Sequence, residues 1–263
     1  MLKYIFHKCK ANLRKLFLIS LYFLFHHRKA LAKLSSYGFS DIKVCRFRRW
    51  QWWQWHNSRE KNYQRFYYKA KYSNKIYFIK VSKDDYTVKN EIFINEYLIQ
   101  CGVTFAPKLL MSDENYGKNT AMIAFEFISE IYNFELADDE KAFEFICKEF
   151  EYIHGHFLKF NIIHGDISAS NLLLGNKNNI VLIDFALSWV PGSEVFKLRH
   201  PCGLYHVLSD NKHVYDNAFS FLRMLDDCGI SDAFKQKECY KRIEKLLGVH
   251  TYSAPVSIIE EHL

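Results

Sequence analysis

Short runs of aromatic and β-branched residues fill the first half of the chain and are separated by polar turns, a pattern typical of β-strands. Between two of these runs stands the pair Ser73-Asn74, which predicts a tight hairpin turn. The expected strands cover residues 42–50, 63–72, 75–83, 107–111 and 120–128.

Helical periodicity marks two longer segments. Residues 87–102 predict a helix that begins near Asp85 or Thr87. Gly102 is expected to end this helix, because glycine is favoured just beyond a helix C-terminus. In the second half, apolar side chains recur at three- and four-residue steps, as in a helix that faces a core. They are Phe143, Ile146, Phe150, Ile153 and Phe157.

Two short strands are expected at 171–174 and 180–184, and the chain from about residue 205 onward has a helical pattern. A strand-rich half followed by a helix-rich half predicts an α+β fold with two lobes. The expected division is a basic, apolar N-terminal helix over 1–36, an N-lobe over 37–128 and a C-lobe over 129–263.

Three polar side chains interrupt apolar surroundings near the two short strands: Asp166, Asn171 and Asp184. A hairpin brings its two ends together, so Asn171 and Asp184 are expected to lie close to each other. One oxygen from each could share Mg²⁺, whose remaining ligands would be water and phosphate oxygens. Asp166 lies slightly apart and suits the orientation and deprotonation of a hydroxyl group.

The arrangement His164-Gly165-Asp166, Asn171 and Asp184-Phe185 resembles the catalytic loop and metal-binding motif of the protein-kinase-like superfamily. The resemblance implies a bilobal kinase-like fold and transfer of phosphate from ATP with Mg²⁺. It implies that Asp166 is the catalytic base, that Asn171 and Asp184 bind the metal, and that His164 supports the loop.

The same resemblance implies a strand lysine that binds the nucleotide phosphates and a helix acid that positions it. Lys80 ends a run similar to V-A-I-K, and the following helix offers Glu91 and Glu96. Five residues correspond to about 140° of rotation on a helix, so the two glutamates cannot both face Lys80. Glu91 is the preferred candidate, and Glu96 is the alternative.

The superfamily resemblance also places the nucleotide base between the lobes, against the hinge residues Glu126 and Ile128. Other features depart from the pattern. No glycine occurs between Gly38 and Gly102, so the usual glycine-rich phosphate loop is missing. Its place is taken by 48–62, whose Trp and Arg residues suit either ligand stacking or a strand core.

Composition and charge limit the class of protein and the compartment in which it is expected. Hydrophobic residues make up 49% of the chain and aromatics 17%, which argues against a disordered chain. The seven cysteines form no C-x-x-C pair, which favours reduced thiols in the cytoplasm over a zinc site or a disulfide framework. Residues 1–49 hold twelve Lys or Arg and a single acid, for a charge of +11, and the rest of the chain carries −4, which gives the net charge of +7.

The N-terminal charge suggests an anionic partner such as the inner face of a bacterial inner membrane. The apolar run at 16–25 spans about 15 Å as a helix, half of the roughly 30 Å of a hydrocarbon core. It therefore predicts either an interfacial anchor or a helix packed on the domain. Nucleic acid is not expected to be a partner.

Three functions fit these features. The chain resembles the lipopolysaccharide core heptose/Kdo kinases, which implies phosphorylation of a sugar hydroxyl of a glycolipid acceptor. It also resembles a small atypical Ser/Thr protein kinase or ATPase, including the kinase-like ATPase of the tRNA threonylcarbamoyl-adenosine machinery. The third possibility is a non-catalytic pseudokinase that serves as a binding module. The first is the preferred expectation, because Gly165 replaces an arginine typical of regulated protein kinases and residues 187–210 look short for a peptide-docking segment.

Overall fold

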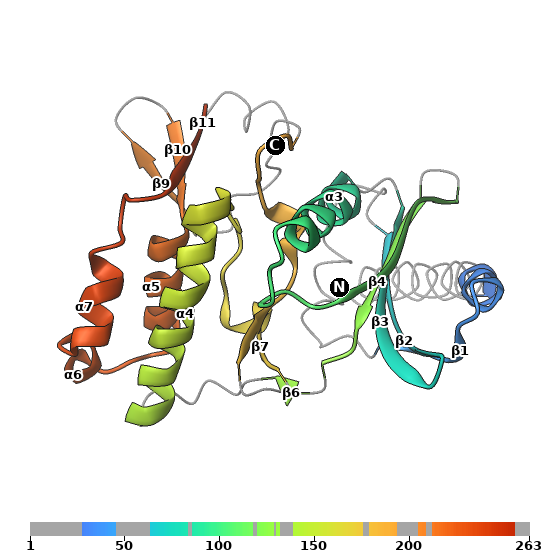
Figure 1. The fold of residues 1–263 in the computed structure, drawn as a ribbon, viewed down its shortest axis with the longest axis horizontal. Helices are drawn as coiled ribbons and strands as arrows, with labels where there is room; N and C mark the ends of the chain where they lie inside the picture. Colours follow the sequence, from blue (N-terminus) through green and yellow to red (C-terminus); the bar gives the residue numbers. More distant parts are fainter. Residues whose placement is uncertain are drawn as a thin grey trace, which may run out of the picture.

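The computed structural model describes residues 28–45, 64–83, 86–117, 120–128, 130–131, 139–175, 179–193, 205–208 and 212–255. Its largest sheet has five antiparallel strands in the order β1-β2-β3-β5-β4 (Figure 1). The strands are β1 (Ser40–Val44), β2 (Gln64–Tyr72), β3 (Lys75–Lys83), β4 (Leu109–Gly117) and β5 (Thr120–Glu126).

The expected hairpin turn joins β2 and β3. Ser73 and Asn74 both have positive φ, at 45° and 65°. Positive φ at both central residues gives a two-residue turn whose twist matches that of the flanking strands. The β2–β3 register that follows, with Tyr67 opposite Lys80, sends Lys80 to one face of the sheet while its neighbours Ile79 and Val81 join the core on the other.

Both faces of this sheet are covered. Helix α3 (Tyr86–Gln100) packs Val88 and Ile92 against one face. On the other face, a helical segment over residues 28–36 buries Ala30 and Leu34 in a cluster with the strand residues. This described part of the N-terminal segment packs on the domain. The apolar run at 16–25, for which an anchor or a packed helix was expected, and all of 48–62 lie outside the described residues.

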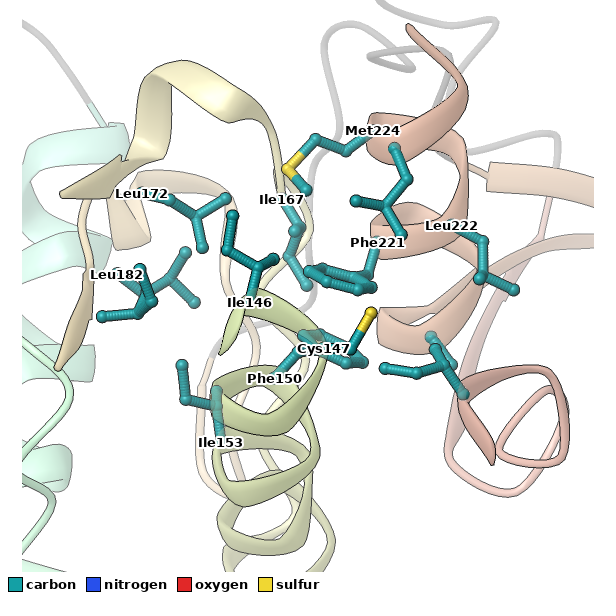
Figure 2. Packing of buried hydrophobic residues seen from close by; sticks show 14 of the residues in the cluster. Ile146, Cys147, Phe150, Ile153, Ile167, Leu172, Leu182, Phe221, Leu222 and Met224 are labelled. Atoms are coloured by element: carbon teal, nitrogen blue, oxygen red, sulfur yellow. The ribbon is translucent and has the colours of Figure 1, made fainter. Parts of the chain in front are cut away.

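The second lobe is built around α4 (Glu140–Phe160), the core-facing helix expected from the sequence. Figure 2 shows Cys147 and Phe150 of α4 facing Phe221 and Leu222 of α5 (Asn217–Asp227). The rings of Phe150 and Phe221 stack with centroids 3.9 Å apart. The short helices α6 (Asp232–Lys235) and α7 (Glu238–Glu244) complete this side of the core.

A small three-stranded sheet lies between the lobes, in the order β6-β7-β8. In β7 (Leu172–Leu174) and β8 (Ile180–Leu182), Leu172 pairs with Leu182. The residues just outside that pair are Asn171 and Ile183, and the Ile183 N–H donates to the Asn171 carbonyl at 2.9 Å. The hairpin therefore brings Asn171 beside the residue that precedes Asp184. The third strand, β6 (Glu130–Ile131), pairs with β7.

The expectation of an all-helical region after residue 205 was wrong. Besides α5 to α7, this region holds a three-stranded sheet in the order β11-β10-β9, seen beside α5 in Figure 1. Its strands are β9 (Tyr205–Leu208), β10 (Lys212–Asp216) and β11 (Thr251–Pro255). Strand β11 finds its partner across three intervening helices, and a local hydrophobic pattern carries no sign of so distant a pairing.

Together, the five-stranded sheet with α3 and the helical lobe around α4 form a bilobal, kinase-like α+β fold. Among the residues that the structure describes, no helix is both long enough and apolar enough to span a bilayer.

Candidate functional site

A buried lysine joins three separate elements. Lys80 of β3 places Nζ 2.6 Å from Glu91 Oε2 of α3 and 2.8 Å from Asp184 Oδ1, which follows β8. The side chains of Lys80 and Glu91 are 5% and 2% exposed, whereas that of Asp184 is 36% exposed. Water is therefore kept from the Lys80–Glu91 pair, while the Asp184 carboxylate stays open to a ligand.

The structure chooses between the two glutamates of α3. Glu91 is buried against Lys80, whereas Glu96 is exposed. The rotation of about 140° over five helical residues accounts for the difference. The Asn95 side chain donates to the Glu91 carbonyl at 2.7 Å, an interaction that sequence reasoning did not anticipate.

His164 is fully buried, and its ring joins the loop that carries Asp166 to the end of β8. Nε2 lies 3.1 Å from the Ile183 carbonyl, and the Asp166 N–H donates to Nδ1 at 3.2 Å. These partners require a proton on Nε2 and none on Nδ1, the neutral tautomer. Burial lowers the pKa of His164 to about 4, against the opposing effect of the Asp184 carboxylate. The ring is therefore a neutral structural link at neutral pH.

Gly165 is required at its position. Its φ is +78°, and a Cβ built there would lie 2.2 Å from the Leu187 carbonyl oxygen. That distance is far inside van der Waals contact, and the backbone conformation is one that favours glycine. No arginine or other side chain fits here, so this glycine in place of the arginine of typical protein kinases has a steric cause.

Asp166 and Asn171 contact each other across the catalytic loop. The Asn171 side-chain nitrogen donates to the Asp166 carbonyl at 2.9 Å and to Asp166 Oδ2 at 3.0 Å. Burial raises the pKa of Asp166 to about 6, and the charge of Asp184 adds to the rise, while the Asn171 hydrogen bond and Lys80 oppose it. At neutral pH this carboxylate is ionised and has the proton affinity that suits a general base.

Asp184 adopts a left-handed backbone conformation, with φ 64° and ψ 60°. Aspartate tolerates this region better than most residues, and such conformations are concentrated at functional sites. Here the turn lets the chain leave β8 and enter a short 3-10 helix, Phe185–Leu187, while the carboxylate still reaches Lys80.

A sequence model of the RIO domain matches residues 42–191, more than half of the chain. The chain belongs to the RIO-domain family. Proteins of this family are atypical members of the protein-kinase-like superfamily, so this protein is a kinase that uses ATP with Mg²⁺. The match supports the superfamily resemblance but does not single out the sugar kinases. No curated protein matches the chain.

The donor set of this RIO domain suits Mg²⁺. In the described part of the chain, no group of three His, Cys, Asp or Glu side chains could hold a metal ion. Mg²⁺ does not need such a group, because it takes one or two protein oxygens and completes its shell with water and phosphate. The half-exposed Asp184 carboxylate and the Asn171 amide oxygen can supply those two, since the Asn171 nitrogen is directed to Asp166.

The predicted hinge lies at the end of β5. The Glu126 N–H donates to the Lys108 carbonyl at 2.8 Å, and the Phe127 N–H donates to the Ile76 carbonyl at 3.1 Å. Glu126 and Ile128 are half-buried where the chain leaves the five-stranded sheet. Their contact with a nucleotide base stays a prediction.

Two buried asparagines support the site and were missed from the sequence. Asn90 of α3 donates to the Ala186 and Ser188 carbonyls at 3.1 and 2.9 Å, which ties the helix carrying Glu91 to the segment after Asp184. Asn217 opens α5 and accepts from the His164 N–H at 2.9 Å. The only signal for Asn217 was the pair Asp216-Asn217 before an apolar helical run, which is typical of a helix N-terminus.

Proposed function

We propose that this RIO-domain protein is an atypical serine kinase or ATPase. The observation that carries the proposal is the buried Lys80–Glu91 ion pair, which shares Lys80 with the accessible carboxylate of Asp184. The ionised Asp166 stands on the other side of Asn171. Phosphoryl transfer needs side chains that bind the metal ion, a lysine that binds phosphate and a base of suitable proton affinity.

In the proposed mechanism, Lys80 binds the α- and β-phosphates of ATP, and Glu91 holds Lys80 in place. Asn171 and Asp184 would hold Mg²⁺, which would supply positive charge against the phosphate oxygens. Asp166 orients a hydroxyl group and accepts its proton as the oxygen bonds to the γ-phosphorus. The bond from the γ-phosphorus to the bridging oxygen breaks, and ADP leaves. With water in place of the hydroxyl group, the same steps give ATP hydrolysis.

For the lobes we propose the boundaries expected from the sequence. Residues 37–128 would form the lobe that carries Lys80 and Glu91, and residues 129–263 would form the lobe that carries Asp166, Asn171 and Asp184. Glu126 and Ile128 lie at the hinge and would face the nucleotide base. Residues 1–36 would precede the lobes as a basic segment with affinity for an anionic membrane surface.

A second candidate is phosphorylation of a sugar hydroxyl of a lipopolysaccharide core, heptose or Kdo, at the inner membrane. Gly165 favours it, because the arginine that pairs with a phosphorylated activation segment in regulated kinases has no room here. The basic residues of 1–49 would bring such an enzyme to its acceptor at an anionic surface. The family match supports the serine kinase or ATPase more than it supports this candidate.

The test supplies the full chain with Mg²⁺ and γ-labelled ATP, and follows both ADP release and the fate of the label. A serine kinase transfers label to itself or to a generic protein acceptor, and an ATPase releases labelled phosphate. Label on deacylated core oligosaccharide, with none on protein, would support the sugar kinase instead. Lys80→Met is the control, because it removes the phosphate-binding charge. Turnover in that variant equal to wild type would contradict the proposed site.

A further inference from the structure

A segment near the end of the chain, residues 248–252, lies against the back of the catalytic loop. It connects α7 to β11 and lies beyond residue 191, where the RIO-domain match ends. Figure 1 shows β11 returning beside β10, the strand that leads into α5. Three of its residues contact parts of the chain that hold the loop. Gly248 contacts Asp216 before α5, His250 contacts Asn161 at the end of α4, and Tyr252 contacts Trp189. These three are called the C-terminal brace below.

The first contact fixes the start of α5. The Gly248 N–H donates to Asp216 Oδ2 at 2.7 Å. The other carboxylate oxygen of Asp216 caps α5 by accepting from the Ala218 and Phe219 N–H groups. Asp216 is 1% exposed, so both of its oxygens depend on protein partners.

The start of α5 in turn holds the catalytic loop. Asn217, next to Asp216, accepts from the His164 N–H at 2.9 Å and donates to the Ile162 carbonyl at 2.8 Å. A shift of Asp216 would move Asn217 and hence both ends of the segment that leads to Asp166. The Gly248 contact therefore acts on the loop through two intervening residues, Asp216 and Asn217.

The second contact fixes the entrance to the loop. His250 Nε2 lies 2.7 Å from Asn161 Oδ1, and an amide oxygen can only accept, so the imidazole N–H donates. Asn161 ends α4 in a left-handed conformation, with φ 52° and ψ 53°. It is the last residue before Ile162, whose carbonyl Asn217 holds. His250 thus anchors the point at which the chain turns from helix to loop.

The third contact supports the strand beside the loop. The rings of Tyr252 and Trp189 stack with centroids 4.8 Å apart and an interplanar angle of 27°. Trp189 forms an antiparallel bridge with Ile163, in which each N–H donates to the other carbonyl, at 2.9 and 2.7 Å. The stack therefore covers the residue next to His164.

We propose that the C-terminal brace is a positioning element for phosphoryl transfer, which holds residues 161–166 in register so that Asp166 meets the acceptor hydroxyl. The inference rests on the proposed function. The described contacts of Gly248, His250 and Tyr252 are with Asp216, Asn161 and Trp189, so they act on the loop through these residues. Loss of the brace should lower kcat and leave the KM for ATP unchanged, because Lys80, Glu91 and Asp184 are held by other contacts.

The test compares His250→Ala with His250→Gln in the full chain. Glutamine carries an N–H donor at a similar reach and should keep the bond to Asn161, whereas alanine loses it. Misplacement of a reacting group by about 1 Å can cost about 100-fold in rate, so a partial release should lower kcat about ten-fold in His250→Ala. His156→Ala is the matched control, since His156 also lies near the end of α4, its described hydrogen bond is with the Tyr152 carbonyl of the same helix, and its ring contacts Phe105 and not the loop.

A second pair of variants, Tyr252→Leu and Tyr252→Phe, is used if His250→Ala does not fold. Leucine removes the ring stack with Trp189, and phenylalanine keeps it. The brace is supported if the alanine and leucine variants lose kcat at constant KM for ATP while glutamine and phenylalanine restore it. Equal kcat in His250→Ala and His156→Ala, or a parallel rise in the KM for ATP, would overturn it.

Hydrogen exchange at the amides of His164 and Trp189 separates this inference from the proposed function. These two N–H groups donate to Asn217 and Ile163, and they should exchange faster in His250→Ala than in His156→Ala. If the wild type shows no phosphoryl transfer, the proposed function fails, and the exchange rates alone decide the brace. Equal exchange in the two variants would overturn it.

Discussion

The two sides of the candidate site are held by different interactions. On the phosphate side, Lys80, Glu91 and Asp184 form ion pairs in which two of the three side chains are almost fully buried. On the loop side, the neutral amide of Asn217 holds the backbone around His164 through hydrogen bonds with the His164 N–H and the Ile162 carbonyl. Ion pairs tolerate small changes of angle, whereas hydrogen bonds fix direction. The phosphate side therefore gathers charge, and the loop side sets geometry.

The comparison predicts that the largest loss of stability follows from breaking the ion pairs. Lys80→Met leaves two carboxylates without their cation, and removal of one partner of a buried pair costs about 3–5 kcal/mol. The free energy of unfolding from urea titration should fall accordingly. Adding Glu91→Gln to Lys80→Met should recover part of the loss, since the stranded buried charge is then removed. If the double variant were less stable than Lys80→Met, the ion-pair account would be contradicted.

A smaller loss is expected on the loop side. Asn217→Ala leaves the buried His164 N–H without its acceptor, and an unsatisfied buried donor costs about 1–3 kcal/mol. The same titration should show this loss, accompanied by faster amide exchange at His164. Asn115→Ala changes an exposed asparagine and should leave both measurements unchanged. An Asn217→Ala protein as stable as Asn115→Ala would show that the loop is held by other means.

The sequence predicted the phosphate side better than the loop side. The acids and the lysine stand in sequence patterns typical of phosphoryl transfer, and helical rotation excludes that both glutamates of α3 face Lys80. The hydrogen-bond partners of Asn90 and Asn217 lie about 100 and 50 residues away in the chain. An asparagine at the start of a helix, such as Asn217, is also explained as an ordinary helix cap. Their roles could not be read before the fold was known.

The same contrast holds for the fold. The β2–β3 hairpin was predictable because its turn residues and its strands are adjacent in the chain. Strand β11 was missed because it pairs with β10, which precedes it by more than 30 residues and three helices. Local periodicity finds elements, but it does not report which distant elements meet.

The buried carboxylate of Asp166 is expected to lower the stability of the folded protein, and this can be tested. Its pKa is raised from 3.8 to about 6, so the folded protein binds its proton more tightly than the unfolded chain. Stability is therefore lost as pH rises through this range, and at pH 7 the ionised carboxylate costs about 1–2 kcal/mol after allowance for solvent screening. Asp166→Asn should raise the unfolding free energy of the nucleotide-free protein at pH 7. A decrease would contradict the raised pKa.

His154 is expected to give the smallest effect on stability, and its pH dependence has the opposite sign to that of Asp166. Burial first, and then the neighbouring His250, lower the pKa of His154 from 6.5 to about 4. Between these values the unfolded chain binds a proton that the folded protein does not, so stability falls as pH falls from about 6.5 toward 4. His154→Phe should flatten the pH dependence by about 1 kcal/mol per pH unit near pH 5. An unchanged slope would show that His154 is not buried in its neutral form.

The most direct test of the account is the single-turnover rate of phosphoryl transfer in wild type and in Asp166→Asn, measured with saturating Mg²⁺ and ATP alongside the Kd for ATP. The proposed mechanism assigns the acceptor hydroxyl to Asp166 and the phosphates to Lys80, so the variant should transfer at least about 100-fold more slowly. Its Kd for ATP should be nearly unchanged. An equal transfer rate, or loss of ATP binding in a variant that is still folded, would contradict the assignment of Asp166 as the base.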